Sequence, residues 1–233
     1  MHIIITRPKE DSLYLIEKLI KLGHVATHLP LIKIKKLETE KINLKNYEAV
    51  IFTSSNAIRF MNIEKFNSKI KCFCVGNATE FTAKQAGFVN TYSSGGTVDS
   101  LIELIMRTID NKSGKLLYLS SEFISKNLDK DLINAGYSVD RISNYTSLPT
   151  NEINENTLNF FKKKPPDVIF IYSSKSAKNL IKLINKYSLL NVVTHSNLMC
   201  ISEKVLLLLK EIKWKKVFIF NPGEEDFLIK KIS

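Results

Sequence analysis

The segment VIFTSSNAIRF, residues 50–60, changes character within a few positions. It begins as an apolar run typical of a buried strand, and it continues with apolar residues spaced as in a helix. Three hydroxyl residues, Thr53, Ser54 and Ser55, stand between the two parts. Ser and Thr are favoured as helix N-caps, and the start of a helix also favours an anion. The segment therefore predicts a strand and a helix joined by a loop that caps the helix, binds an anion, or does both.

A second segment repeats this design. VIFIYSSKSAKNL, residues 168–180, again joins an apolar run to a helical pattern through two serines. Elsewhere, short apolar runs alternate with amphipathic stretches, as in HIIIT followed by DSLYLIEKLIKLG. Gly23, Gly87 and Gly136 each follow a helical pattern, in the position of a C-terminal cap. Strands and helices that alternate at these lengths predict an α/β fold with parallel sheets.

The two halves of the chain are similar to each other. Residues 47–55 align with residues 166–174, Cys74 with Cys200, and Gly23 with Gly136, at nearly constant offsets. An internal repeat of roughly 110 to 120 residues is therefore indicated, and each half holds βα units of flavodoxin-like size.

The composition argues against several classes of protein. The chain has 233 residues, and none of its uncharged apolar runs reaches the roughly 18 residues that a membrane span needs. Its N-terminus lacks the pattern of a signal peptide, and its three cysteines lack C-x-x-C spacing, which fits a reducing compartment. We therefore expect a cytoplasmic protein with no membrane partner and no metal site. A monomer is expected because no coiled-coil pattern or apolar surface stripe is visible.

The net charge of +11 would suit a polyanionic ligand. The basic residues are spread along the chain, and no segment interleaves arginine with aromatic residues as single-strand binders do. We expect no nucleic-acid partner.

Small polar residues gather where predicted strands lead into helices. In open α/β sheets, ligands bind at the carboxyl ends of the strands, where helix N-termini favour anions. No Walker loop and no G-x-G-x-x-G sequence is present, so nucleotide binding is disfavoured. The simpler explanation for each loop is helix capping. The candidate ligand-binding residues are Ser54, Ser55, Asn56, Gly76, Asn77, Thr79, Ser173, Ser174, Lys175 and Lys204.

The order of these motifs resembles that of the uroporphyrinogen-III synthase family. The matching pieces are ITRP (5–8), FTSSNA (52–57), VGNAT (75–79), a strand ending at Tyr145 and SSKSA (173–177). They cover essentially the whole chain, and their joint order is more specific than any one of them. The resemblance implies an α/β fold with two flavodoxin-like parallel-sheet domains joined by a two-stranded extended connector.

The resemblance also implies an enzyme of tetrapyrrole biosynthesis that needs no cofactor. Such an enzyme takes the linear tetrapyrrole hydroxymethylbilane, expels its hydroxyl, inverts the last pyrrole ring and closes the macrocycle to uroporphyrinogen III. Each ring of the substrate bears an acetate and a propionate, which agrees with helix-terminus loops and a basic surface. The alternative is a non-catalytic two-domain module that binds a polycarboxylate or a phosphorylated small molecule.

The domain boundaries that the resemblance implies differ from those of the repeat. The repeat alone suggests a boundary near residue 112. In the family, the first strand and helix belong to the domain completed by the C-terminal half. The expected domains are therefore residues 1–33 with 149–233, and residues 37–145.

Motif matching implies roles for several side chains. Ser54 and Thr79 in one domain and Ser173 in the other would donate hydrogen bonds to substrate carboxylates. Arg7 either assists them or forms a salt bridge that fixes the ITRP turn. Tyr145 matches a tyrosine near the reacting end of the substrate. Since a phenol with a pKa of about 10 is a poor acid at neutral pH, Tyr145 would act as a hydrogen-bond donor to the departing hydroxyl. The alternative role of Tyr145 is that of an aromatic anchor where the connector meets the domain.

The last quarter of the chain departs from the family pattern. The counterpart of VGNAT reads ISEKV, with Val205 where a threonine is expected. Lys204 would supply a charged partner in its place, whereas Glu203 opposes an anion.

Overall fold

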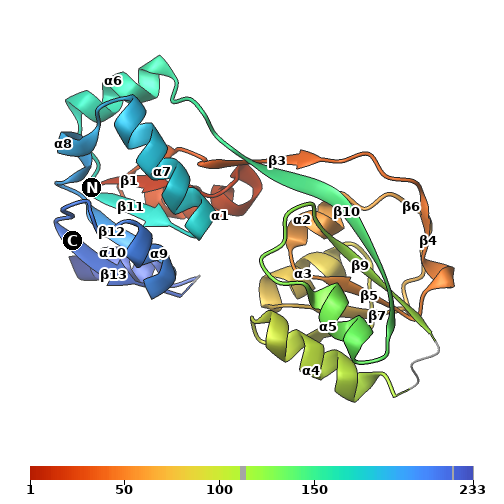
Figure 1. Ribbon diagram of the computed structural model, residues 1–233. Helices are drawn as coiled ribbons and strands as arrows, with labels where there is room; N and C mark the ends of the chain where they lie inside the picture. Colours follow the sequence, from red (N-terminus) through yellow and green to blue (C-terminus); the bar gives the residue numbers. More distant parts are fainter. Residues whose placement is uncertain (111–113, 222, 233) are drawn as a thin grey trace. The chain divides into compact units, whose positions relative to one another are not determined.

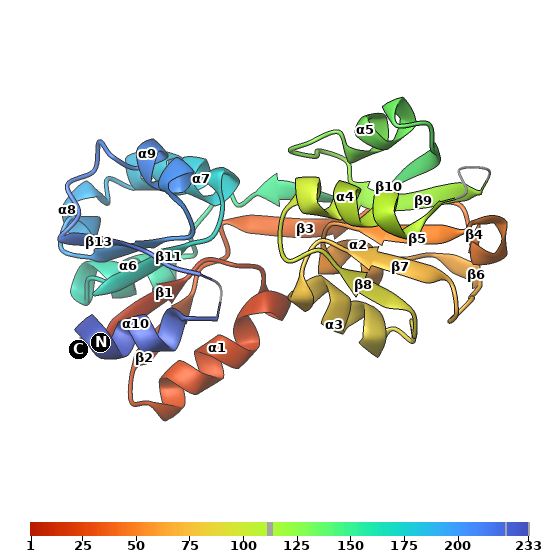
Figure 2. The same cartoon turned by 90° about the horizontal axis from the view of Figure 1, so that it is seen from below.

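The computed structural model describes residues 1–110, 114–221 and 223–232. The chain divides into two compact units (Figures 1 and 2). Unit 1 contains Met1–Lys33 and Leu148–Ser233, and unit 2 contains Ile34–Ser147. The strands β3 (Ile32–Lys36) and β10 (Ser138–Pro149) carry the chain across the two boundaries, and they are neighbours in one sheet. The boundary near residue 112 that the repeat suggested lies outside the described residues.

Unit 1 contains a five-stranded parallel sheet between helices. The strands, in sheet order, are β13 (Lys216–Ile219), β12 (Asn197–Cys200), β11 (Val168–Ile171), β1 (His2–Ile5) and β2 (Val25–His28). One face packs against α6 (Glu155–Lys163), α7 (Ser174–Lys186), α8 (Leu190–Val193) and α9 (Glu203–Leu208). The other packs against α1 (Lys9–Lys21) and α10 (Glu225–Ile232). Numbered along the unit's own chain, the strand order is 2-1-3-4-5, the flavodoxin-like order.

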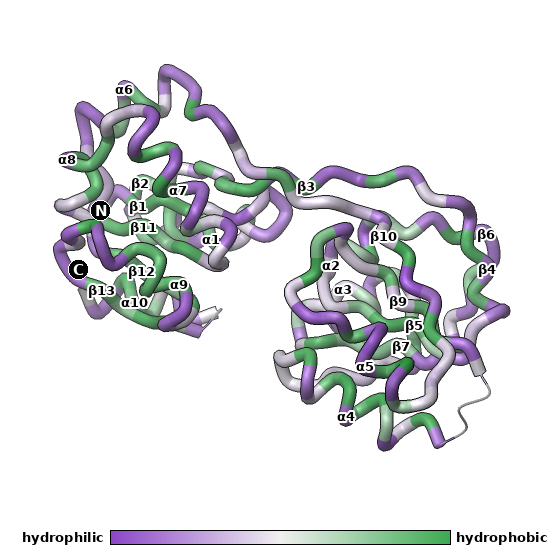
Figure 3. Tube along the Cα trace, in the orientation of Figure 1, coloured by the Kyte–Doolittle hydropathy of each residue, from purple (hydrophilic) through white to green (hydrophobic). Residues whose placement is uncertain are grey.

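Unit 2 is built on a second sheet of six strands. They are, in sheet order, β3, β10, β9 (Lys115–Ser121), β5 (Ala49–Phe52), β7 (Lys71–Cys74) and β8 (Thr91–Ser93). The helices α2 (Ser55–Arg59) and α3 (Asn77–Gln85) cover one face, and α4 (Val98–Thr108) and α5 (Leu128–Asn134) cover the other. A small pair of strands, β4 (Ile42–Asn43) and β6 (Ile63–Lys65), lies beside the 3-10 helix η1 (Leu44–Asn46). Figure 3 shows hydrophobic residues concentrated along central strands such as β5, β7, β9 and β11, and hydrophobic and hydrophilic positions alternating along the helices.

The two sheets have the same arrangement of strands. The order β2-β1-β11-β12-β13 in unit 1 corresponds to β10-β9-β5-β7-β8 in unit 2. The sequence repeat aligns β11 with β5, β12 with β7 and β2 with β10. Each unit is therefore assembled from strands of both halves of the chain. The prediction of an α/β fold with two parallel-sheet domains is confirmed.

Two glycines end equivalent helices in the two units. Gly23 follows α1 and Gly136 follows α5, with φ angles of 80° and 93°. L-residues with a Cβ atom rarely adopt this left-handed conformation, so both positions favour glycine and stop the helix before the next strand.

His2 at the start of β1 is a buried titratable group. Its ring Nδ1 lies 2.9 Å from the carbonyl oxygen of Lys164, and its Nε2 lies 2.9 Å from Oγ1 of Thr27. A neutral ring satisfies both contacts if Nδ1 donates to the carbonyl and Nε2 accepts from the hydroxyl. Burial lowers the pKa of His2 below its ordinary value, because the charged form is poorly solvated there.

We predict that unit 1 loses stability as the pH falls below about 6.5, the ordinary pKa of histidine. The neutral form contributes stability above the unfolded-state pKa, and this contribution is lost as the pH falls through the lowered native pKa. The measurement is urea unfolding at about pH 7.5 and about pH 5.5, followed by the fluorescence of Trp214, the one tryptophan of the chain. His2→Gln should show a smaller change between the two pH values, and an equal change in both proteins would contradict the prediction.

Candidate active site

In each unit, five neighbouring strands run parallel, so their carboxyl ends meet at one edge of the sheet. In open α/β sheets, the ligand crevice lies at this edge where connections diverge to opposite faces. In unit 2 this point lies between β5 and β9, since β5 leads into α2 and β9 leads into α5 on the other face. In unit 1 the corresponding point lies between β1 and β11. The residues that follow these four strands are the first candidates for function.

Ser54 and Ser173, which follow β5 and β11, both cap helices. Oγ of Ser54 accepts a hydrogen bond of 3.2 Å from the N–H of Asn56 at the start of α2. Oγ of Ser173 accepts one of 3.0 Å from the N–H of Ser176 at the start of α7. Capping uses a lone pair of the hydroxyl oxygen, so the hydroxyl hydrogen can still be donated. Oγ of Ser173 also lies 2.9 Å from Oγ of Ser176, and either hydroxyl can be the donor.

Two other predicted residues of unit 2 hold its loops together. Ser55 donates to the carbonyl oxygen of Ala78 over 3.3 Å and accepts from Thr82 over 3.0 Å, which ties α2 to α3. Oδ1 of Asn56 accepts a hydrogen bond of 2.9 Å from Nη1 of Arg59. These contacts fix the loop that follows β5. Ser55 and Asn56 therefore lie at the carboxyl edge of the sheet of unit 2.

The VGNAT segment forms the start of α3. Gly76 is the N-cap, and its carbonyl oxygen accepts from the N–H groups of Thr79 and Glu80, each over 3.0 Å. Asn77 is exposed and accepts a hydrogen bond of 3.1 Å from the hydroxyl of Ser93. Thr79 is only 6% exposed, so of the two side chains only Asn77 is open to solvent.

Tyr145 is buried in unit 2, with 7% of its surface exposed. Its backbone is in register with Ser121, the last residue of β9. Burial raises the pKa of the Tyr145 phenol above its ordinary value, while the nearby hydroxyls of Ser54 and Ser121 act to lower it. The phenol therefore stays protonated at neutral pH and can donate a hydrogen bond without ionising.

A pocket of about 210 Å³ lies beside Tyr145 at the carboxyl edge of the sheet. Much of its polar lining consists of hydroxyl groups. Within it, Oγ1 of Thr53 and the phenol of Tyr118 lie 3.1 Å apart. The full lining is Thr53, Val75, Val98, Tyr118, Ser121, Phe123, Ile124, Ser125, Lys126 and Tyr145. Hydroxyl groups donate and accept hydrogen bonds without bringing a fixed charge into a half-enclosed site.

Sequence reasoning did not identify the segment after β9 as part of this pocket. The strand KLLYLSS ends in two serines, Ser120 and Ser121, as the strands before Ser54 and Ser173 are followed by two serines. This third serine pair was the available signal. Lys126, in the same loop, forms ion pairs with Asp99 and Asp131 and places a positive charge beside the hydroxyls.

In unit 1, Arg7 follows β1 and stacks on an aromatic ring. Its guanidinium carbon lies 4.8 Å from the centre of the Tyr172 ring, and its carbonyl oxygen lies 2.9 Å from Nε2 of His28. Burial, and secondarily the carboxylate of Glu225, raise the pKa of Tyr172 well above its usual range. The ITRP turn thus presents a cation on an aromatic support.

The remaining candidates of unit 1 lie at helix starts. Ser174 is the first residue of α7, and Lys175 after it is exposed, as is Lys204 in α9. Val205, which replaces the expected threonine, is 2% exposed and packs in the core of unit 1. The departure from the family pattern therefore fills the core, and Ser202 still caps α9 through the N–H of Val205.

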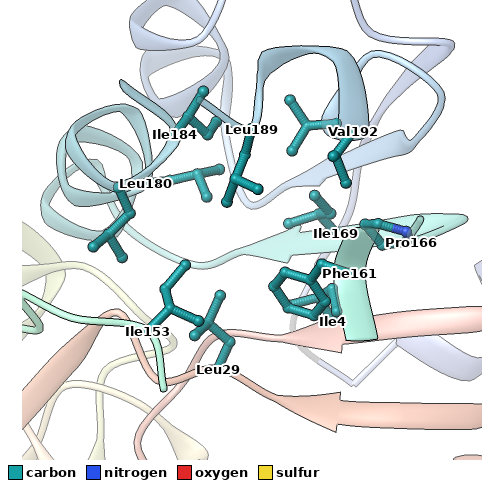
Figure 4. A pocket seen from close by; sticks show the side chains of 12 residues that line it. Ile4, Leu29, Ile153, Phe161, Pro166, Ile169, Leu180, Ile184, Leu189 and Val192 are labelled. Atoms are coloured by element: carbon teal, nitrogen blue, oxygen red, sulfur yellow. The ribbon is translucent and has the colours of Figure 1, made fainter. Parts of the chain in front are cut away.

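Unit 1 also holds a small apolar cavity between α7, α8 and the sheet (Figure 4). Its volume is about 20 Å³, and side chains such as Leu180, Ile169 and Phe161 line it. This volume is near that of one water molecule, and the lining offers no polar side chain. We regard the cavity as a packing gap rather than a ligand site.

The described residues offer neither a metal site nor a membrane-spanning helix. No cluster of three or more His, Cys, Asp and Glu side chains in residues 1–110, 114–221 and 223–232 is placed to hold a metal ion. Within the same ranges, no helix combines the length and the apolar composition that crossing a membrane requires.

Comparison with known proteins identifies the family. Residues 14–226 match the family model described as uroporphyrinogen-III synthase HemD. The matched residues include most of both units. The chain belongs to the uroporphyrinogen-III synthase family. The family resemblance of the motif order is thereby confirmed.

A curated relative and two solved structures agree with this family. The porphyrin biosynthesis protein HemD of Ruminiclostridium josui is 26% identical over 169 residues, 66% of this chain and 33% of that protein. The chain thus spans about a third of the length of this relative. The uroporphyrinogen-III synthetase of Helicobacter pylori superposes with a TM-score of 0.63 at 16% identity, covering 99% of this chain and 97% of that one. A mutant uroporphyrinogen III synthase of Thermus thermophilus gives a TM-score of 0.58 at 14% identity, covering 100% and 97%. At these identities the two structures show the synthase fold.

We predict that the stability of unit 2 falls above about pH 10, in part because of Tyr145. A group whose pKa is raised in the native state stabilises the fold below its unfolded-state pKa. This contribution to the free energy of unfolding is lost as the pH rises through the native pKa. Tyr145→Phe removes the titrating group, so its unfolding midpoint in urea should fall less between about pH 8 and about pH 11. Tyr14→Phe is the control, because Tyr14 is 79% exposed. If both variants lose stability as the unmodified protein does, Tyr145 is not the group responsible.

Proposed function

We propose that this protein converts hydroxymethylbilane to uroporphyrinogen III. The reaction expels the substrate hydroxyl as water, inverts the last pyrrole ring and closes the macrocycle. The observation that carries the proposal is the family match over residues 14–226, which includes most of both units. The hydroxyl-lined pocket beside Tyr145 supports it, because the reaction needs hydrogen-bond donors around a leaving hydroxyl.

Tyr145 is the proposed catalytic residue. Because burial raises its pKa, the phenol keeps its proton at neutral pH. It donates a hydrogen bond to the hydroxyl as the carbon–oxygen bond breaks, and the hydroxyl leaves as water after taking a proton from solvent. The phenol oxygen also faces the cation that forms, and its partial negative charge stabilises that cation. The rest of the catalysis lies in holding the chain so that the ring-closing carbon meets this cation.

The substrate carboxylates are proposed to bind at the carboxyl edges of the two sheets. In unit 2 the proposed donors are Ser54, Asn56 and the backbone N–H groups at Gly76 and Asn77. Ser55 and Thr79 belong to the same proposal, but the Ser55 hydroxyl would have to leave the carbonyl oxygen of Ala78, and the buried Thr79 would have to become accessible. In unit 1 the proposed donors are Arg7, Ser173, Ser174, Lys175 and Lys204. The net charge of +11 favours the approach of such a polyanion. The exposed Lys175 and Lys204 support this role most directly.

The remaining expectations form part of the same proposal. The domains are residues 1–33 with 149–233, and residues 37–145. The enzyme acts in the cytoplasm as a monomer, uses no cofactor, and has no nucleic-acid or membrane partner. The competing proposal is a binding module without catalysis, for which the loss of the threonine at Val205 is the favouring observation.

The proposed function predicts a specific product. Incubated with hydroxymethylbilane, the protein should give the type III isomer, whereas spontaneous closure gives type I. After oxidation, the two porphyrin isomers are separated by chromatography and quantified. Protein that binds hydroxymethylbilane but leaves type I as the product would support the binding module and refute the enzyme.

Tyr145→Phe should lower kcat for type III formation by roughly 10²-fold, because one donor to the leaving hydroxyl is lost. KM should change little, since the carboxylate contacts are intact. Initial rates at several substrate concentrations provide both constants. Tyr14→Phe, at an exposed position, should match the unmodified protein. A Tyr145→Phe variant with full kcat would leave Tyr145 as an aromatic anchor only.

A further inference from the structure

The strand that carries Tyr145 contains a one-residue irregularity. In the pairing of β10 with β9, Ser143 is opposite Ser120, and Tyr145 is opposite Ser121. Asn144 is therefore an extra residue without a partner on β9, which is the geometry of a β-bulge. Bulges change the direction of the side chains that follow them, and the residue that follows this one is Tyr145.

The bulge decides which face of the sheet Tyr145 occupies. Side chains alternate along a strand, and Val139 packs on the α4–α5 face whereas Ile142 packs on the α2–α3 face. In a regular strand Tyr145, three residues after Ile142, would return to the α4–α5 face. It packs instead in the same cluster as Ile142. The extra residue thus turns Tyr145 towards the face of the sheet that is covered by α2, the helix that Ser54 caps.

Asn144 is held on two sides. Its side chain is completely buried, and Nδ2 donates a hydrogen bond of 2.7 Å to the carbonyl oxygen of Ala57 in α2. Its own carbonyl oxygen accepts one of 3.0 Å from the N–H of Leu37. The helix α2 has a single turn, so its last carbonyl groups need partners outside the helix. The Asn144 amide supplies one and joins α2 to the bulge.

We propose that Asn144 is a positioning residue, which acts by holding Tyr145 and Ser54 in one fixed arrangement. This inference rests on the proposed function, because it takes Tyr145 as the group that assists departure of the hydroxyl. Asn144 precedes Tyr145 on β10, and the hydrogen bond from its side-chain amide to Ala57 joins this strand to α2, the helix that Ser54 caps. It contacts neither the substrate nor the reacting atoms.

The test compares Asn144→Ala with Asn62→Ala. Asn62 also donates its amide to a backbone carbonyl, that of Thr39 over 2.8 Å, but it lies outside the pocket in the same unit. We expect Asn144→Ala to lower kcat about tenfold or more, since small displacements of catalytic groups are costly, with KM little changed. Asn62→Ala should keep kcat. Equal kcat values in the two variants would overturn the inference.

A double-mutant cycle separates positioning from general damage. In the Tyr145→Phe background, Asn144→Ala should cause a much smaller loss of kcat, because the catalytic group that it positions is already absent and Ser54 is assigned to carboxylate binding. Independent, multiplying losses would overturn the inference. If Asn144→Ala does not fold, Asn144→Ser, which keeps a smaller donor, takes its place, with an intermediate loss expected and full kcat as the contrary result.

A readout without substrate distinguishes the inference from the proposed function. The ultraviolet absorbance of ionising phenols is followed with rising pH. Burial raises the pKa of other tyrosines as well, such as Tyr118 and Tyr172, so the step of Tyr145 is obtained as the difference between the curves with and without Tyr145→Phe. Asn144→Ala should move this step to lower pH, and Asn62→Ala should not. If the unmodified protein makes no type III product, the proposed function fails while this titration still decides the positioning role. An unmoved step, with normal activity of the unmodified protein, refutes the inference alone.

Discussion

Parallel pairing between strands from opposite halves of the chain is the interaction on which both units depend. In unit 1, β1 pairs with β11, and the buried hydroxyl of Thr6 adds a 2.6 Å hydrogen bond to the carbonyl oxygen of Phe170. In unit 2, β5 pairs with β9 in the same sense. Each pairing brings together two loops that diverge to opposite faces, so it creates the crevice in which a ligand site can form. Fold and site share this origin.

The chemistry of the crevice in unit 2 follows from its buried hydroxyl groups, which carry no fixed charge. Thr53, Tyr118, Ser121 and Tyr145 bring hydroxyls to a place where a buried carboxylate or ammonium group would be costly to desolvate. Burial also keeps the phenols protonated, and a protonated phenol is a donor that does not compete with the substrate's negative charge. The positive charges, such as Lys126, stay at the margin, where water solvates them.

The features that depend on periodicity and on local preferences were predictable from the sequence. VIFTSSNAIRF and VIFIYSSKSAKNL indicated strands, capped helices and parallel sheets, and motif order indicated the family. The bulge at Asn144 was not predictable, because it results from how β10 pairs with β9, and no local pattern marks it. The end of β9 was missed for a similar reason: Ser121 is placed beside Tyr145 by the pairing of β9 with β10.

The exchange of strands between the halves has a consequence for synthesis on the ribosome. The strands of unit 2 lie within one continuous stretch of chain, so its sheet can close while later residues are still being added. The sheet of unit 1 can form only after its later strands have been synthesised. For example, the backbone N–H of His2 donates to the carboxylate of Asp167, 165 residues further on. Until β11 emerges, β1 and β2 present apolar side chains and an unpaired edge. The nascent chain therefore carries this exposed pair of strands until β11 has been synthesised, and early chaperone contact would protect it.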